Sequence, residues 1–346
     1  MMNKISCSLF AAAALCAAVF PASAQLFSDP APPTVRKLAD VAPPEPRKQD
    51  ELKFRAAPKP LAPGAVTHEW RRFLGPTMDG ISSETPLLKQ FGKGGPPIVW
   101  EVAKGEGYAA PAVVSGRVVL FHRVEDEEIV ECLHAETGQR FWKYAYAMSY
   151  RDRYGFDGGP RCQPVSDGEC VYTFGVAGKL TCLNLTTGQM LWQRDIFREF
   201  KLQQNFFGIG STPLLEGDFL IVNVGAEGGP CVAAFDKRSG KMAWGAGKEW
   251  GPSYASPIPA EVRGKRRVFV FAGGDSEPST GGLLCIDPKT GKVDFSFPWR
   301  AERRESVNAS SPLIIGNQVY VSECYGPGGA LLDIQPDGSA RRGSPG

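Results

Sequence analysis

The connection between Trp142 and Pro164 has the residue types best suited to binding chemistry. It is rich in tyrosine, arginine and aspartate, and it contains Arg153, Asp157 and Arg161. Aromatic rings combined with arginine supply large contact areas and directional hydrogen bonds, which is the composition of binding hot spots. This segment therefore predicts a binding surface. The alternative is a plain connection whose Arg and Asp side chains pair with one another.

Two further connections hold polar residues at equivalent places. The first contains Asn205, and the second contains Arg300 and Asn308. Each connection precedes an apolar strand that starts with an X-Pro step, and such connecting loops commonly carry binding residues. We expect the polar side chains of all three connections to converge at one mouth of a central channel. This mouth would bind a small polar ligand, an ion or a peptide.

Metal and nucleophile chemistry have little support in the sequence. The chain has only three histidines, His68, His122 and His134, and no spacing typical of a zinc site. It also has no Gly-x-Ser-x-Gly elbow, phosphate loop or dinucleotide fingerprint. We therefore predict no catalytic residue and no metal site.

The cysteines do not indicate a disulfide framework. Nine are present, and two of them fall within the first 24 residues, which leaves an odd number for the rest of the chain. Counting back from a two-residue turn places Val165 opposite Cys170, so Cys170 does not face Cys162. We expect no obligatory disulfide, and the pairing of Cys231 and Cys324 stays open.

A repeat of about fifty residues must position these groups. Each copy has a small residue, a polar turn that ends in glycine, and a large aromatic residue four positions after the glycine. The turn glycines are Gly138, Gly188, Gly240 and Gly291, separated by 188 − 138 = 50, 240 − 188 = 52 and 291 − 240 = 51 residues. The small and aromatic residues are Cys132 with Trp142, Cys182 with Trp192, Ala234 with Trp244, and Cys285 with Phe295. This period is that of a four-stranded propeller blade.

Each unit also starts with an X-Pro step, an apolar run, a tight turn and a second apolar strand. Five such starts occur, at Pro111, Pro164, Pro213, Pro257 and Pro312. The fourth unit has a basic turn over residues 261–267, which we expect to be longer than the others. The pattern predicts an all-β propeller with about five four-stranded blades, which form either a closed ring or part of an incomplete ring of seven or eight. Each aromatic ring is expected to nest over the small residue of a neighbouring blade.

The segment from Ala234 to Trp244 has the pattern small-x-Asp-x-x-Ser-Gly-x-x-x-Trp. This pattern resembles the docking repeat of the pyrroloquinoline quinone (PQQ) dehydrogenase propellers and of their non-enzymatic relatives, which include an outer-membrane assembly propeller. The resemblance covers roughly residues 70–340. It implies a PQQ-like propeller repeat protein, and PQQ is a cofactor by this resemblance alone.

The resemblance also implies features that can be sought in the chain. The dehydrogenases of the family carry two adjacent cysteines over the cofactor, calcium ligands and a catalytic Asp. No two cysteines are adjacent in this chain, and no Cys-x-x-Cys-His haem motif occurs. We therefore interpret the chain as a binding or assembly scaffold without catalytic residues. The alternative is a quinoprotein dehydrogenase-like enzyme with a degenerate or missing site.

Composition divides the chain into three parts. Residues 1–24 have the pattern of a signal peptide with cleavage between Ala24 and Gln25, which predicts a periplasmic or secreted protein. Residues 25–66 are rich in proline and charge and predict a disordered linker. Residues 67–346 form the propeller domain. A net charge of +2 and the absence of a long apolar run after residue 24 favour a protein or small polar partner over nucleic acid or a membrane span.

The last unit lacks the strand with the aromatic residue, and residues 340–346 take its place. Two explanations stay open. The chain is truncated, or the early strand around Trp100 supplies the missing outer strand and closes a ring of five blades. We predict truncation, because an unclosed propeller otherwise exposes a sheet face and its edges.

Overall fold

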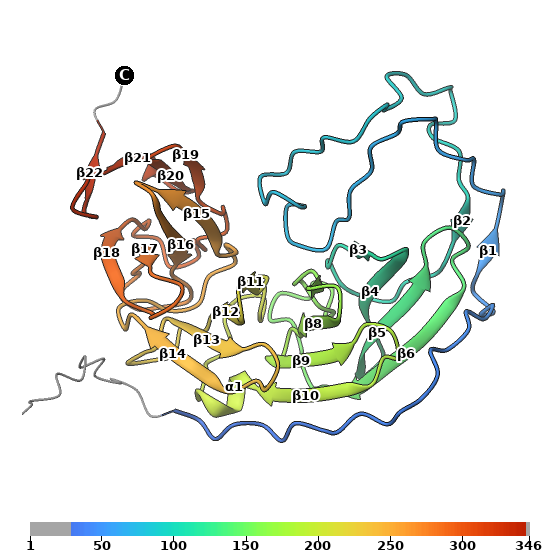
Figure 1. The fold of residues 1–346 in the computed structure, drawn as a ribbon. Helices are drawn as coiled ribbons and strands as arrows, with labels where there is room; N and C mark the ends of the chain where they lie inside the picture. Colours follow the sequence, from blue (N-terminus) through green and yellow to red (C-terminus); the bar gives the residue numbers. More distant parts are fainter. Residues whose placement is uncertain (1–28, 344–346) are drawn as a thin grey trace, which may run out of the picture.

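A computed structural model describes residues 29–343 and shows an almost entirely β-sheet fold. Five four-stranded antiparallel sheets are each built from four consecutive strands, and a separate two-stranded sheet precedes them. The five sheets fan out in sequence order as an open arc (Figure 1). The predicted β-propeller with about five four-stranded blades is therefore confirmed. The predicted signal peptide lies outside the described residues.

The strands are assigned to blades in chain order. Blade 1 contains β3 (Ala112–Val114), β4 (Arg117–Val124), β5 (Glu127–His134) and β6 (Arg140–Ala147). Blade 2 contains β7 (Val165–Ser166), β8 (Cys170–Phe174), β9 (Lys179–Asn184) and β10 (Met190–Asp195). Blade 3 contains β11 (Leu214–Glu216), β12 (Phe219–Asn223), β13 (Val232–Asp236) and β14 (Met242–Ala246). Blade 4 contains β15 (Ile258–Val262), β16 (Lys265–Ala272), β17 (Gly282–Ile286) and β18 (Val293–Pro298). Blade 5 contains β19 (Leu313–Ile315), β20 (Gln318–Glu323), β21 (Gly328–Ile334) and β22 (Ala340–Arg342).

The remaining elements are short. The two-stranded sheet pairs β1 (Lys53–Phe54) with β2 (Trp100–Glu101), and α1 (Ile196–Glu199) is a single helical turn after β10. No helix in the described part of the chain is long enough to cross a bilayer.

The strand order fixes two faces. In each blade the first strand is inner and the fourth is outer, as β11 and β14 show in Figure 1. Because successive strands are antiparallel, the segments that link one blade to the next lie at the same end of the strands as the loops between second and third strands. We call this end the connection face. The opposite end, the turn face, holds the hairpin turns between first and second and between third and fourth strands.

Near the centre, the residues before the X-Pro prolines link the blades. The backbone nitrogen of Gln163 donates to Thr212 Oγ1 (3.2 Å), that of Thr212 to Ser256 Oγ (3.0 Å), and that of Ser256 to Ser311 Oγ (3.1 Å). A residue before proline is restricted to extended backbone, so these donors and hydroxyls are held in register. This ladder spans blades 2 to 5.

At the outer side, each indole docks on the turn of the following blade. The ring of Trp192 lies against Gly240, where a Cβ atom would come within 2.8 Å of the indole. Gly240 also has φ +67°, so both the space and the backbone require glycine. The indole nitrogens of Trp142, Trp192 and Trp244 donate to the carbonyl oxygens of Leu185 (2.9 Å), Lys237 (3.1 Å) and Pro288 (3.0 Å).

The aromatic ring does not dock over the small residue of a neighbouring blade, which is where the sequence predicts it. Cys182 lies opposite Trp192 on the neighbouring strand of the same blade, and Cys132 lies opposite Trp142 in the same way. The ring therefore extends past its small partner and reaches the glycine turn of the next blade. Hydrophobic clusters fill the space between successive blades; for example, Trp192 and Phe235 belong to one cluster between blades 2 and 3.

The strand around Trp100 does not close the ring. Trp100 Nε1 donates to Ala135 O (2.9 Å), and its ring lies against Gly138, so it docks on blade 1 as the other indoles dock on later blades. β2 pairs with β1, whereas β22 pairs with β21 and with no other strand of residues 29–343. Closure of a five-bladed ring by this strand is therefore wrong, and truncation stays a prediction.

The proline-rich segment follows the outer edge of blades 3, 2 and 1 (Figure 1). Arg36 N donates to Leu191 O (2.8 Å), and Arg47 exchanges two backbone hydrogen bonds with Arg140 (2.9 and 2.8 Å). Leu52 is buried against Gly138. Where the sequence predicts a disordered linker, the chain from Arg36 to Leu52 thus contacts the outer edges of the blades, because edge strands offer unpaired backbone groups. Residues 53–55 pair with the strand around Trp100 instead. The predicted domain boundaries stay a prediction.

The basic turn of blade 4 is not longer than the others. Val262 pairs with Lys265, which leaves only Arg263 and Gly264 between the strands, with φ of +52° and +68°. This is the geometry of a tight two-residue hairpin. Arg263 N donates to Asn317 Oδ1 (2.9 Å) in blade 5, which helps to hold the turn.

The seven cysteines within residues 29–343 are free. The predicted pairing of Val165 with Cys170 is wrong, because Val165 pairs with Tyr172 and Ser166 with Val171. Four residues, 167–170, lie between the last paired residues Ser166 and Val171 instead of two. Cys231 is buried and its thiol donates to Trp250 O (2.8 Å), whereas Cys324 is exposed.

We expect Trp192→Ala to destabilise the propeller by about 3–5 kcal/mol, since it removes a fully buried ring between two blades. Trp192→Phe should cost less, because it retains apolar volume and loses the hydrogen bond to Lys237 O. Urea unfolding followed by circular dichroism measures both changes. Equal stability of Trp192→Ala and the parent chain would contradict the docking role.

Candidate functional site

Five aromatic rings from three connections meet on the connection face. Tyr154 and Phe156 come from the β6–β7 connection, Phe206 and Phe207 from the β10–β11 connection, and Tyr254 from the β14–β15 connection. Phe207 lies at the centre, with ring centroids 5.6 Å from Tyr154, 5.8 Å from Phe156 and 5.7 Å from Tyr254. Tyr154 and Phe156 are 54% and 58% exposed. We call these five residues the aromatic cluster.

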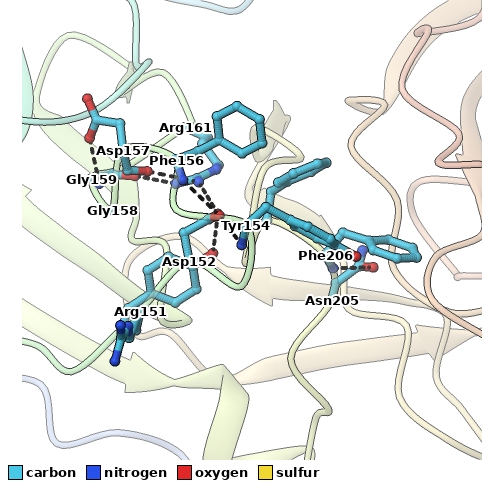
Figure 2. Close-up of polar contacts among 12 residues, drawn as sticks. Arg151, Asp152, Tyr154, Phe156, Asp157, Gly158, Gly159, Arg161, Asn205 and Phe206 are labelled. Carbon is cyan, nitrogen blue, oxygen red and sulfur yellow. Dashed lines mark hydrogen bonds and ion pairs between the residues drawn. The ribbon is translucent and has the colours of Figure 1, made fainter. Parts of the chain in front are cut away.

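A buried carboxylate holds the exposed rings in place. Asp152 Oδ1 accepts hydrogen bonds from the backbone nitrogens of Tyr154 (2.9 Å) and Phe156 (3.1 Å), and Oδ2 pairs with Arg161 (3.0 Å) (Figure 2). Burial by itself would raise the pKa of Asp152, but the hydrogen bonds from Tyr154 and Phe156, with smaller contributions from Tyr150 and Arg161, lower it overall. Asp152 is therefore a charged group that orders the loop.

Arg161 serves the same loop. Its side chain is 10% exposed, and its guanidinium donates to the carbonyl oxygens of Gly159 (2.6 Å) and Asp157 (3.0 Å) as well as to Asp152. The guanidinium carbon also lies 5.6 Å from the centre of the Tyr150 ring. Arg161 is thus engaged within the protein, in agreement with the alternative that Arg and Asp of this connection pair with one another.

A second carboxylate, Asp275 in the β16–β17 loop, joins three connections. Its oxygens pair with Arg153 (2.9 Å) and Arg304 (2.7 Å), and its backbone nitrogen donates to Asn205 Oδ1 (3.0 Å). Burial would raise the pKa of Asp275, but hydrogen bonds and charge from Arg304 and Arg153 outweigh it and lower the pKa. Arg153 and Arg304 remain 42% and 56% exposed.

Arg300 is fully occupied by its surroundings. Its Nε donates to Ser279, and its two terminal nitrogens donate to the oxygens of Asn308 and to the carbonyls of Gly273, Gly274 and Ser306. All five N–H donors of the guanidinium are therefore used. Arg300 stabilises the connection between blades 4 and 5, and it has no free donor for a ligand.

The six residues predicted to line a binding face thus form three hydrogen-bonded groups on the connection face. Arg161 donates to the carbonyl oxygen of Asp157. Arg153 and Asn205 both contact Asp275. Arg300 donates to Asn308 Oδ1. The sequence analysis did not select Asp152 or Phe207, although both lie in connections that it singled out, and it missed Asp275. Tyr154 and Phe156 were within the segment that it singled out, but Asp275 lies in a loop between strands of one blade that it did not consider.

Two adjacent cavities open beside these groups. A polar cavity of about 570 Å³ is lined by Arg153, Arg304 and Asp275 together with loops of blades 3 and 4. A smaller cavity of about 130 Å³ is lined mainly by apolar side chains, including Leu202 and Ile209. Residues Gln203, Gln204, Asn205 and Pro252 line both.

The histidines lie away from this surface or act structurally. His122 is buried in blade 1, where Nδ1 accepts from Gly105 N (2.9 Å) and Nε2 lies 3.4 Å from Glu131. Among residues 29–343 no group of three or more His, Cys, Asp or Glu side chains could hold a metal ion.

Comparison with known proteins identifies the family. Residues 125–340 match the family described as outer membrane protein assembly factor BamB. The chain belongs to this PQQ-like propeller repeat family. A segment of 143 residues is 31% identical to the quinohemoprotein alcohol dehydrogenase ADH-IIG of Pseudomonas putida, and this segment covers 39% of the chain and 19% of the dehydrogenase.

Similarity to one solved structure supports the fold, and a second solved structure is also similar. A europium-containing methanol dehydrogenase matches with a TM-score of 0.50 at 14% identity, over 69% of this chain and 50% of that protein. BamB from Moraxella catarrhalis matches with a TM-score of 0.44 at 16% identity, over 70% of this chain and 63% of that protein. The chain therefore spans less than two thirds of the length of each of these relatives.

We expect Asp152→Ala to loosen residues 150–161, because it leaves Arg161 buried without its carboxylate and frees two backbone donors; breaking such a pair costs about 3–5 kcal/mol. Since folding lowers the pKa of Asp152, its stabilisation is complete above its usual value of 3.8 and is lost as pH falls through the lower folded pKa. The protection factors of the Tyr154 and Phe156 amides against hydrogen exchange should therefore fall in the mutant and, in the parent chain, in strong acid.

Asp157→Ala is the matched control for this loop. Among the described residues its carboxylate accepts a hydrogen bond only from Gly159 N (3.1 Å), so exchange at Tyr154 and Phe156 should stay close to that of the parent. Equal acceleration in both variants would show that Asp152 has no special role.

Proposed function

We propose that the chain is an exported binding scaffold that holds a protein partner on the aromatic cluster of its connection face. The observation that carries this proposal is the exposure of Tyr154 and Phe156 on a loop that Asp152 has already ordered. Exposed aromatic side chains with nearby arginine are typical of interface hot spots. A pre-ordered loop also loses less conformational entropy on binding.

The charge pattern of the site supports a protein partner. The basic side chains Arg153 and Arg161 are paired with carboxylates of the same surface, so the cluster does not form a one-signed patch. Membership of a family described as an outer membrane assembly factor is consistent with a scaffold. Export rests on the signal peptide pattern of residues 1–24.

A photoactivatable amino acid at position 156, in the full chain expressed in cells of the source organism, tests this function. We expect one discrete crosslinked protein. The same group at Arg238, in the β13–β14 turn on the turn face, is the matched control and should not give that product. Tyr154→Ala with Phe156→Ala should lower the affinity for the captured protein by about thirtyfold or more. Identical products from positions 156 and 238 would argue against the proposal.

A quinone-dependent dehydrogenase is the second candidate, because of the 31% identity to a quinohemoprotein alcohol dehydrogenase. The residues present do not fit this cofactor well. PQQ is an anionic quinone, yet the polar cavity is lined by as many acidic as basic side chains. Arg300 cannot add to its positive charge there, because all its donors bind the chain's own oxygens. The described cysteines include no adjacent pair. We therefore favour the scaffold.

Titration with PQQ and calcium distinguishes the two functions. We expect the absorbance of PQQ to be unchanged by the protein, and alcohols to cause no reduction of an artificial electron acceptor. A saturable absorbance shift together with alcohol-dependent dye reduction would establish the dehydrogenase alternative.

A further inference from the structure

The polar cavity beside the aromatic cluster has a guanidinium available for a ligand. Arg304 is anchored by Nε to Asp275 Oδ1 (2.7 Å). Within the described residues its two terminal nitrogens have no hydrogen-bond partner, and the side chain is 56% exposed. Arg304 thus differs from Arg300, whose donors are all used. A planar guanidinium held at Nε presents its remaining donors in the geometry that a carboxylate accepts.

The charges around Arg304 favour a single carboxylate over a polyanion. Two guanidinium groups, from Arg153 and Arg304, share the one carboxylate of Asp275. The hydrogen bond to Asp275, with a smaller contribution from Glu277, raises the pKa of Arg304. The cavity lining as a whole contains four basic and four acidic side chains. A ligand that carries many negative charges would therefore meet the acidic groups as well.

The smaller cavity offers an apolar binding site next to the polar cavity. Its volume of about 130 Å³ suits one branched aliphatic side chain, and Val176, Leu202 and Ile209 are among its walls. Gln203, Gln204 and Asn205 lie between the two cavities and line both. Their amides can donate to and accept from the backbone of an extended segment that passes from one cavity to the other.

We propose that these two cavities bind an extended peptide segment of the partner, with an Asp or Glu paired to Arg304 and a nearby aliphatic side chain in the apolar cavity. This inference rests on the proposed protein-binding function and specifies the sequence that the partner presents. The aromatic cluster borders the same connections, so the peptide forms one part of a larger interface.

Synthetic peptides test this specificity with the full chain. The probes are fluorescein-labelled decapeptides of Gly, Ser and Ala that carry one Leu and one Asp two to four residues apart, in either order, measured by fluorescence anisotropy. We expect at least one spacing to bind saturably. Changing its Asp to Asn should weaken binding about tenfold, as expected for a charged hydrogen bond. Changing its Leu to Ala should weaken binding to a similar extent.

Variants of the protein assign each effect to its cavity. Arg304→Met should abolish the preference for Asp over Asn and leave the preference for Leu unchanged. Ala177→Leu, which fills the apolar cavity, should do the reverse, with Ala177→Ser as its size control. Arg303→Met is the matched charge control, because Arg303 is similarly exposed on the same connection but does not line the polar cavity.

Three outcomes would overturn the inference: no peptide of the set binds, Asp and Asn peptides bind equally, or Arg303→Met acts like Arg304→Met. Crosslinking at position 156 distinguishes this failure from failure of the proposed function. A captured partner whose affinity depends on Phe156 but is unchanged by Arg304→Met and Ala177→Leu would retain the scaffold and reject the peptide site.

Discussion

The structure depends on the docking of each indole against the turn of the following blade. A ring such as that of Trp192 contributes apolar contact, and its nitrogen donates a hydrogen bond to the carbonyl oxygen of Lys237 in that turn. The turn accepts the ring only because Gly240 has no side chain and can adopt a positive φ. A four-stranded sheet has two faces to cover and cannot do so alone, so this contact makes each blade a support for the previous one.

Docking at the outer side and the hydroxyl ladder near the centre together fix the angle between blades. The ladder joins Thr212, Ser256 and Ser311 through single backbone donors, so neighbouring inner strands cannot slide without breaking it. The fixed angle between blades also fixes the relative positions of the loops on the connection face. Its loops come from different blades, yet Phe207 contacts rings from two other connections because the blades that carry them are held at a constant offset.

The fold was well predicted, whereas the role of individual polar residues was not. Periodic glycine and tryptophan residues are local marks of a blade, and they identify the propeller without knowledge of the contacts. Arg300 is an example. Its charge and its place in a connecting segment suggest a ligand-binding residue, but five oxygens of nearby loops accept hydrogen bonds from all its donors. Nothing in the one-dimensional pattern distinguishes it from Arg304, whose terminal nitrogens are available. The proline-rich segment is similar, because its attachment to Leu191 and Arg140 uses backbone groups that carry no sequence signal.

The sequence by itself determined the repeat, the four-stranded blade and the place of a glycine in each repeated turn, since these follow from short-range spacing. Tertiary structure alone decided which blade receives each indole and that Trp100 docks on blade 1 without closing a ring. It also decided that Asp275 joins three connections of the connection face. The physical reason is that hydrogen bonds and ion pairs between loops about fifty or more residues apart depend on the angle between blades, and no single blade encodes that angle.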